Sequence, residues 1–231
     1  MQKYFFPLFW IVFLMSVVLF HYKDSIFIFL NMKKTPSPVI VLDAGHGGDD
    51  PGKVGINDAL EKDINLAIVK KLKYYLEKKN FTVILTRDMD IGLSVPGIPH
   101  TKTSDLQARK NIVLEKKPTA FLSIHQNSFP DESQKGAQVF YYSTSESSKL
   151  LAECIQEKFC EMDPTNHRQC KANSDYFLLR ENPHPSVIIE CGFLSNRMEA
   201  DLLSTEEYQK QIAWNICLAL SEYCKKNVDS Q

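Results

Sequence analysis

The stretch that decides the fold runs from Pro38 to Gly48 and reads PVIVLDAGHGG. Its apolar run, Val39 to Leu42, is mostly β-branched and predicts a strand buried inside an α/β sheet. The glycines that follow let the backbone turn sharply and leave the imidazole of His46 uncrowded. Proteins of the α/β class place their sites just beyond the carboxyl ends of such strands. His46 is therefore a candidate functional residue, although a histidine in a glycine turn is more often structural.

Length and composition limit what surrounds this strand. The chain has 231 residues, of which 44% are hydrophobic, which suits one globular domain with a sizeable core and hardly two. The net charge of -1 argues against a nucleic-acid partner, because nucleic-acid binding usually leaves a basic imprint on the sequence.

The amino-terminal segment has a different character from the rest of the chain. Residues 4–20 carry no charge, and no small-x-small cleavage site follows them. We interpret residues 1–30 as an uncleaved signal-anchor or transmembrane segment that places an exported domain on the outer face of the membrane. A linker over 31–37, a globular domain over 38–226 and a tail over 227–231 complete the predicted organisation.

The six cysteines give no recognisable pattern. An exported protein favours disulfides, but Cys154 and Cys160, and likewise Cys217 and Cys224, are too far apart along predicted helices to bridge each other. No C-x-x-C is present, so a cysteine zinc site is not expected. Most of the cysteines are interpreted as small core hydrophobes.

Strands and helices alternate through most of the domain, which predicts a largely parallel sheet covered by helices. The expected strands are 39–42, 81–86, 119–124, 136–142, 175–180 and 186–190, with an irregular stretch over 162–174. The expected helices cover about 61–79, 104–117, 146–161 and the segment from 204 to about 223. Three capping boxes set the expected starts of helices, and their residue pairs are Asp58 with Glu61, Ser104 with Gln107, and Ser204 with Glu207.

Three predicted strands end in a polar residue followed by a turn, and these residues are His46, His125 and Glu190. The carboxyl ends of parallel strands meet at one edge of the sheet, and the loop after the first strand delivers Glu61 to the same edge. Two imidazoles and one carboxylate form a zinc site that keeps one position open for water, and a second carboxylate can take the proton of that water. This is the chemistry of metal-assisted amide hydrolysis.

Each of these residues also has a simpler interpretation. Glu61 could only complement the dipole of its helix, and His125 could be a hydrogen-bonded core histidine. Glu190 is harder to explain in this way, because a carboxylate that ends an apolar strand is costly to bury unless it is paired or functional.

Four ordered motifs resemble the zinc-dependent N-acetylmuramoyl-L-alanine amidases. They read LDAGHGG at 42–48, EKDINL at 61–66, SIHQNSF at 123–129 and VIIECGFLSN at 187–196. The resemblance covers about Val39 to Tyr223. It implies a twisted, mostly parallel mixed sheet of about six strands flanked by helices. One departure is Ala44, where many members of the family have proline.

The resemblance also implies residue roles and a substrate. One zinc ion is expected on His46, Glu61 and His125, with Glu190 as the catalytic base, and the bond cleaved joins the lactyl group of N-acetylmuramic acid to L-alanine of a peptidoglycan stem peptide. Asn127 and Arg180 are candidates for contacts to the glycan strand or its peptide.

Three segments together are similar to the spore-cortex branch of the family, and they read IHQNSF at 124–129, GAQVFY at 136–141 and ECGFLSN at 190–196. That branch is associated with muramic-δ-lactam formation. That branch implies anchoring on the outer face of the cytoplasmic membrane of the developing spore compartment. The segment between Tyr142 and Ser174 is too short for the large blocking helix of some autoinhibited members of the family, and control by a separate activating protein stays open.

Two alternative functions remain at this point. A zinc carboxypeptidase or aminopeptidase acting on cell-wall peptides uses similar ligands on a similar sheet. A non-catalytic wall-binding or regulatory domain is the other alternative, although such a domain has no need for both the ligand set and the base.

Overall fold

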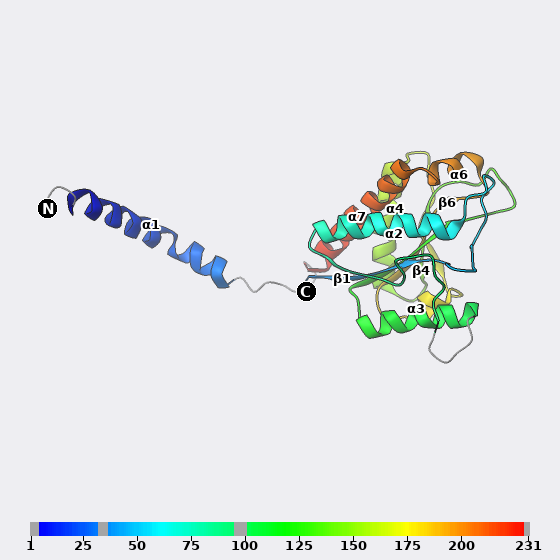
Figure 1. Ribbon diagram of the computed structural model, residues 1–231, viewed down its shortest axis with the longest axis horizontal. Helices are drawn as coiled ribbons and strands as arrows, with labels where there is room; N and C mark the ends of the chain where they lie inside the picture. The colour runs from blue at the N-terminus through cyan, green and yellow to red at the C-terminus, as the bar shows by residue number, and fades with distance from the viewer. Residues whose placement is uncertain (1–4, 32–36, 95–100, 229–231) are drawn as a thin grey trace. The chain divides into compact units, whose positions relative to one another are not determined.

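The structure is a computed structural model that describes residues 5–31, 37–94 and 101–228, and it divides the chain into two units, residues 1–36 and 37–231 (Figure 1). The first unit holds one helix, α1 (Phe5–Asn31). Among the residues described, no helix offers an apolar run long enough to cross a membrane. The anchor expected over residues 1–30 stays a prediction.

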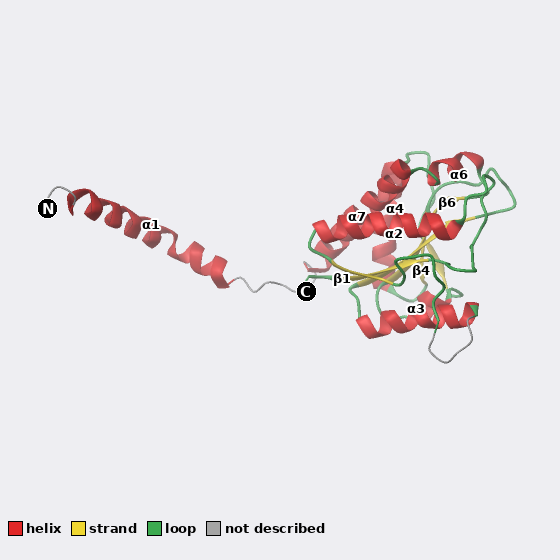
Figure 2. Ribbon diagram, in the orientation of Figure 1, coloured by secondary structure: helices red, strands yellow, loops and turns green. Residues whose placement is uncertain are grey.

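The second unit is built on a six-stranded mixed sheet, as predicted (Figure 2). The strands are β1 (Val39–Ala44), β2 (Thr82–Leu85), β3 (Ala120–Asn127), β4 (Gln138–Tyr142), β5 (Lys171–Asn173) and β6 (Ser186–Phe193). Their order is β2-β1-β3-β6-β4-β5, in which β4 runs antiparallel to β6 and every other neighbouring pair is parallel. β3 therefore lies between the two other strands whose ends were predicted to carry site residues.

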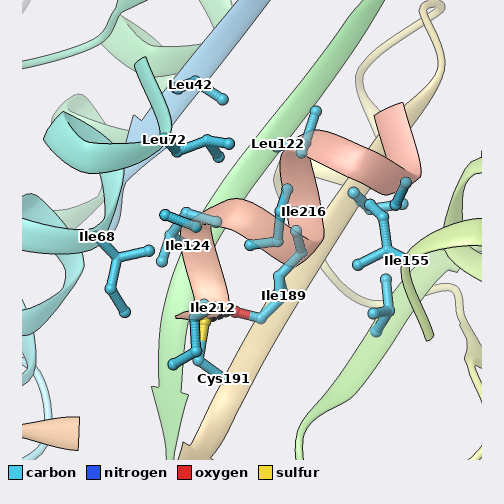
Figure 3. Close-up of a cluster of buried hydrophobic side chains, with 14 of the residues drawn as sticks. Leu42, Ile68, Leu72, Leu122, Ile124, Ile155, Ile189, Cys191, Ile212 and Ile216 are labelled. Atoms are coloured by element: carbon cyan, nitrogen blue, oxygen red, sulfur yellow. Dashed lines mark hydrogen bonds between the residues drawn. The ribbon is translucent and has the colours of Figure 1, made fainter. Parts of the chain in front are cut away.

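Helices cover both faces of this sheet (Figure 1). They are α2 (Glu61–Lys78), α3 (Lys102–Lys116), α4 (Glu146–Met162), α5 (Phe177–Arg180), α6 (Arg197–Leu203) and α7 (Glu206–Val228). The larger core lies between the sheet and helices α2, α4 and α7, where Leu42, Ile124 and Ile189 meet side chains such as Leu72, Ile155 and Ile216 (Figure 3). A smaller cluster on the other face joins Val41 and Phe121 to Val113 of α3 and Leu178 of α5.

The alternation of side chains along β1 sorts its residues between these two faces. Ile40, Leu42 and Ala44 pack into the larger core, whereas Val41 belongs to the cluster under α3. Asp43 has the parity of Val41, so it lies on the α3 face, where Arg109 pairs with it. β1 begins with four apolar residues and carries one buried charge, that of Asp43, on the side of the sheet that α3 covers.

The predicted capping box of the first domain helix is wrong. α2 begins at Glu61 itself, its cap position is Leu60, and no side chain caps it. Asp58 has a left-handed backbone with φ of 65°, in the turn before the helix. The carboxylate of Glu61 points to the two histidines and is not available to the helix end.

Two other helix starts also differ from the prediction. Thr101, and not Ser104, caps α3, and Ser104 is the third residue of a reciprocal capping box. Ser204 ends the short helix α6, which was not predicted, and Thr205 accepts a hydrogen bond from the Tyr208 backbone at the start of α7. Serine and threonine stand at several neighbouring positions in both places, and backbone geometry selects which one caps.

The strand predicted over 175–180 is wrong. Phe177–Arg180 is the short helix α5, and β5 lies at Lys171–Asn173, in the stretch that was predicted to be irregular. The side chain of Asn173 accepts hydrogen bonds from the backbone of Asp175 and Tyr176, which turns the chain out of β5. The sequence also predicts an irregular loop over 88–103, and its residues Pro96, Gly97 and Pro99 lie outside the described residues. All six cysteines are free thiols, and Cys154, Cys191 and Cys217 are buried.

Candidate metal centre

The turn after β1 brings His46 over the end of the sheet. His46 has a left-handed backbone with φ of 63°, which is uncommon for a residue with a side chain. Gly45 precedes it, and a Cβ atom built there would lie 2.2 Å from the His125 ring. A Cβ at Gly52, whose φ is 68°, would lie 2.5 Å from Glu61 Oε2 and 2.7 Å from the His46 ring. Glycines at these two positions leave room for the side chains to converge.

His46, Glu61 and His125 form the one group of potential metal ligands found among the described residues. Glu61 Oε1 lies 3.2 Å from His46 Nε2 and 2.9 Å from His125 Nδ1, and the three ligand atoms all lie within 4.8 Å of one another. Ligands bound to zinc at 2.0–2.1 Å in a tetrahedron are about 3.3 Å apart. The three residues that the sequence predicted as ligands therefore come together at spacings that fit such an ion.

Neighbouring polar groups hold these side chains in place. His46 Nδ1 lies 2.7 Å from Asp50 Oδ2, so its Nδ1–H can donate to that carboxylate and leave Nε2 free for a metal. Glu61 accepts hydrogen bonds from the backbone of Lys53 at 2.8 Å and of Gln126 at 3.1 Å. Asp50 was missed in the sequence, where only its spacing of four residues from His46 in an acidic, glycine-rich loop pointed to it.

Electrostatics favour an anionic Glu61. Burial opposes ionisation, but hydrogen bonds and charge interactions with His125 and His46 outweigh it and hold the pKa of Glu61 well below its usual range. Burial also works against a charged His46, yet Glu61 and Asp50 raise the pKa of that histidine. The buried carboxylate thus supplies the negative charge that a divalent cation requires.

Glu190 stands beside this group with a different character. It lies on β6 directly opposite His125 in the register of the two strands. Its Oε2 atom is buried and has no hydrogen-bond partner among the described residues. Burial raises the pKa of Glu190 to about 7, and the nearby charge of Glu61 adds to the effect of burial. A carboxyl group in this state can both accept and return a proton near neutral pH.

A cavity of about 320 Å³ opens onto these groups. His46, His125 and Glu190 line it, and Tyr176 and Ile188 contribute to its more apolar part. Burial, together with the charges of Glu190 and Glu61, raises the pKa of Tyr176 to about 12, so its phenol remains a neutral hydrogen-bond donor. Nothing in the sequence marked Tyr176, because the segment that carries it was predicted to be a strand.

The two predicted substrate residues are not among those that line this cavity. Asn127 stands at the end of β3, where its side chain accepts a hydrogen bond from the Ser128 backbone at 2.8 Å. Arg180 ends α5, is largely exposed, and donates to Glu181 at 3.1 Å. Their roles in substrate binding stay predictions.

The sequence of this chain is similar to those of known proteins. A family model described as N-acetylmuramoyl-L-alanine amidase matches residues 40–222. The chain is 33% identical over 194 residues to the germination-specific N-acetylmuramoyl-L-alanine amidase of Bacillus subtilis (strain 168), an alignment that covers 83% of this chain and 81% of that protein.

Solved structures give the same result. The CwlD amidase from Clostridioides difficile, determined in complex with the GerS lipoprotein, has a TM-score of 0.78 and 42% identity, and the match covers 82% of this chain and 99% of that one. The catalytic domain of CwlV from Bacillus (Paenibacillus) polymyxa has a TM-score of 0.72 and 30% identity, with coverage of 81% and 98%. The region matched by the family model holds the whole His-Glu-His group and Glu190, and this chain belongs to the N-acetylmuramoyl-L-alanine amidase family.

Proposed function

We propose that this protein hydrolyses the amide bond between the lactyl group of N-acetylmuramic acid and L-alanine of the peptidoglycan stem peptide. One zinc ion held by His46, Glu61 and His125 is the proposed cofactor. The observation that carries the proposal is a three-ligand group, two of whose members line the same cavity as Glu190, whose carboxyl oxygen Oε2 has no partner among the described residues.

The donor set determines the chemistry. When bound by two imidazoles and one carboxylate, zinc supplies a Lewis acid that lowers the pKa of water to about 7 and polarises a carbonyl group. Glu190 accepts the proton of the attacking water as the new C–O bond forms at the lactyl carbonyl. The same carboxyl then donates a proton to the L-alanine nitrogen as the C–N bond breaks, leaving a lactyl carboxylate and a free amine. The pKa of about 7 suits Glu190 to both transfers.

The test compares Glu190→Gln with wild type on purified peptidoglycan. The variant keeps the shape of the side chain but cannot accept a proton, so we expect zinc content to be retained and the rate of amide cleavage to fall by about 10²–10⁴-fold. Undiminished cleavage would contradict the role of Glu190. Glu115→Gln, which changes an exposed carboxylate on α3, is the matched control. His125→Ala should instead lose the metal, as measured by metal analysis.

Product analysis separates the proposal from the two alternatives. The amidase releases an intact stem peptide with a new alanine amino terminus, whereas a zinc peptidase shortens the peptide. A wild-type protein that binds no zinc and cleaves nothing would support the non-catalytic wall-binding alternative.

We further propose a role in spore-cortex maturation through muramic-δ-lactam formation. The support is the likeness to a germination-specific amidase and the motifs around His125 and Glu190. A strain that lacks this protein should make cortex without muramic-δ-lactam, and wild type but not Glu190→Gln should restore it. Cortex with an unchanged lactam content would reject this role.

The expected location and control belong to the same proposal. The uncharged stretch over residues 4–20 supports an anchor that holds the domain on the outer face of the cytoplasmic membrane of the developing spore compartment. The CwlD amidase was solved together with a lipoprotein, which supports control by a separate protein partner. Zinc affinity that is identical with and without such a partner would argue against control at the metal site.

A further inference from the structure

Arg87 is buried against the turn that carries His46, and its hydrogen bonds to described residues all go to main-chain carbonyl groups. It follows β2, is 3% exposed, and donates from Nε to Ala44 O at 2.9 Å and from Nη2 to Gly45 O at 3.1 Å. Nη2 also donates to Lys62 O at 2.8 Å, and Nη1 donates to Met89 O at 3.1 Å. One guanidinium group therefore joins the turn that carries His46 to the first turn of α2, which carries Glu61.

The charge of Arg87 is not balanced by a direct ion pair. Among the described residues, no carboxylate lies within 4.0 Å of its guanidinium. Burial and the nearby charge of Arg109 lower the pKa of Arg87. A buried charge without a partner is costly, and a general packing role would be served better by an apolar side chain. The four carbonyl groups offset this cost together with the more distant charges of Asp43, Asp90 and Asp105.

Arg109 binds the same turn but differs from Arg87 in that carboxylates balance its charge. It pairs with the buried Asp43 and also with Asp105 at 2.5 Å, so its charge is balanced. Its guanidinium also binds the carbonyl groups of Ala44 at 2.8 Å and His46 at 2.9 Å. The carbonyl groups of the turn are therefore held from two directions. Arg87 shares the link to α2 with Asn65, which donates to Gly45 O at 3.1 Å, and with Lys62, which donates to Gly48 O at 2.8 Å.

The turn needs such support because its backbone is strained. A non-glycine side chain in the left-handed region crowds its own backbone, and His46 has φ of 63°. A metal site also needs its ligands held within about 0.5 Å of the productive geometry. Loss of Arg87 would remove its bonds to Ala44 O, Gly45 O and Lys62 O and loosen the spacing between the His46 turn and the amino end of α2.

We infer that Arg87 is a positioning residue for the metal centre, which keeps the backbones of His46 and Glu61 at the spacing that the metal requires. This inference rests on the proposed metal-dependent function. The planar fork of arginine is essential to it, because its three nitrogens bind four carbonyl groups, and the single ammonium group of lysine, with three N–H donors on one atom, cannot keep all four contacts.

The test measures zinc affinity of metal-free protein by competition with a chromogenic chelator, using wild type, Arg87→Lys and Arg87→Met. Arg168→Met is the matched control, since Arg168 is a half-buried arginine that donates to a backbone carbonyl, Lys135 O at 2.7 Å, and touches none of the three ligands. We expect both Arg87 variants to bind zinc 10–100-fold more weakly, the size of effect seen when groups supporting metal ligands are removed. Arg168→Met should bind zinc as wild type does.

Two further readouts separate positioning from a merely structural role. The thermal midpoint of each metal-free variant reports folding, and kcat and KM at saturating zinc report the loaded enzyme. We expect most of the lost kcat to return at saturating zinc, with KM unchanged. Wild-type zinc affinity in a folded Arg87→Lys protein would overturn the inference, and so would failure of both Arg87 variants to fold, which would make Arg87 a general core residue. Wild type is measured first, and its failure to bind zinc would reject the proposed function and not this inference.

Discussion

Two carboxylates in the same site have opposite pKa shifts, and this difference assigns their roles. Imidazole neighbours keep Glu61 ionised, whereas burial raises the pKa of Glu190 to about 7. A permanently charged group suits a metal ligand, and a group that titrates near neutrality suits proton transfer. At the residue scale, the sequence identified both carboxylates, but only their surroundings distinguish them.

The shift at Glu190 predicts a pH dependence of stability in metal-free protein. Its folded pKa of about 7 lies above the unfolded value of 4.5, so the folded state binds more protons between these limits. Stability due to Glu190 is therefore fully present below pH 4.5 and is lost as pH rises through 7, by about 3 kcal/mol in total. Glu190→Gln removes this group.

The measurement is urea unfolding of wild type and Glu190→Gln in the presence of a chelator from pH 4.5 to 8. The free energy of unfolding of wild type relative to the variant should fall across this range. A constant difference would show that burial does not raise the pKa of Glu190.

At the scale of single elements, short polar contacts decide where helices begin. α3 carries Arg109 and Asp105 at its first turns, and its start is fixed by Thr101, whose side chain accepts from the Ser104 backbone at 3.1 Å. Ser104 returns a contact as its hydroxyl accepts from the Thr101 backbone at 2.7 Å. The sequence predicted Ser104 as the cap of α3. Ser104 does belong to the capping box, but it is the third helical residue and Thr101 is the cap.

The capping box predicts a measurable loss of stability. Thr101→Ala removes the acceptor for the Ser104 backbone and should lower the free energy of unfolding by about 1 kcal/mol with an unchanged m value in urea. Thr103→Ala is the control, because Thr103 is exposed on the same turn and alanine suits a helix interior. Equal effects of the two substitutions would reject Thr101 as the cap.

At the scale of the whole molecule, strand order produces the site. β3 pairs with β1 on one side and β6 on the other, so His125 lies one residue beyond the pair Ala44–Ile124 and directly opposite Glu190. The large hydrophobic core lies entirely within the second unit, residues 37–231. That unit therefore has what it needs to fold without the first.

This independence predicts the behaviour of a chain that starts at Ser37. We expect it to unfold with the same thermal midpoint as the full chain in mild detergent, within about 2 °C, since no core residue is removed. After cell lysis it should remain in the supernatant, whereas the full chain should sediment with membranes. Equal partition of the two proteins would contradict the proposed anchor.

The sequence by itself determined the parts of this protein that depend on local pattern. The apolar run before His46, the alternation of strands and helices and the four motifs predicted a mixed helix-covered sheet and the residues His46, Glu61, His125 and Glu190 at one of its edges. Hydrophobic periodicity and turn residues are properties of neighbouring positions, so they can be read without a structure.

The tertiary structure alone decided which polar groups meet. The link from Arg87 to both the His46 turn and α2, the Asp50 contact to His46 and the phenol of Tyr176 in the cavity join segments that periodicity cannot relate. The same holds for the unpartnered oxygen of Glu190, since burial depends on every element packed around it. Local pattern specifies which face of an element is apolar, whereas distances between distant side chains follow only from the packing of the whole chain.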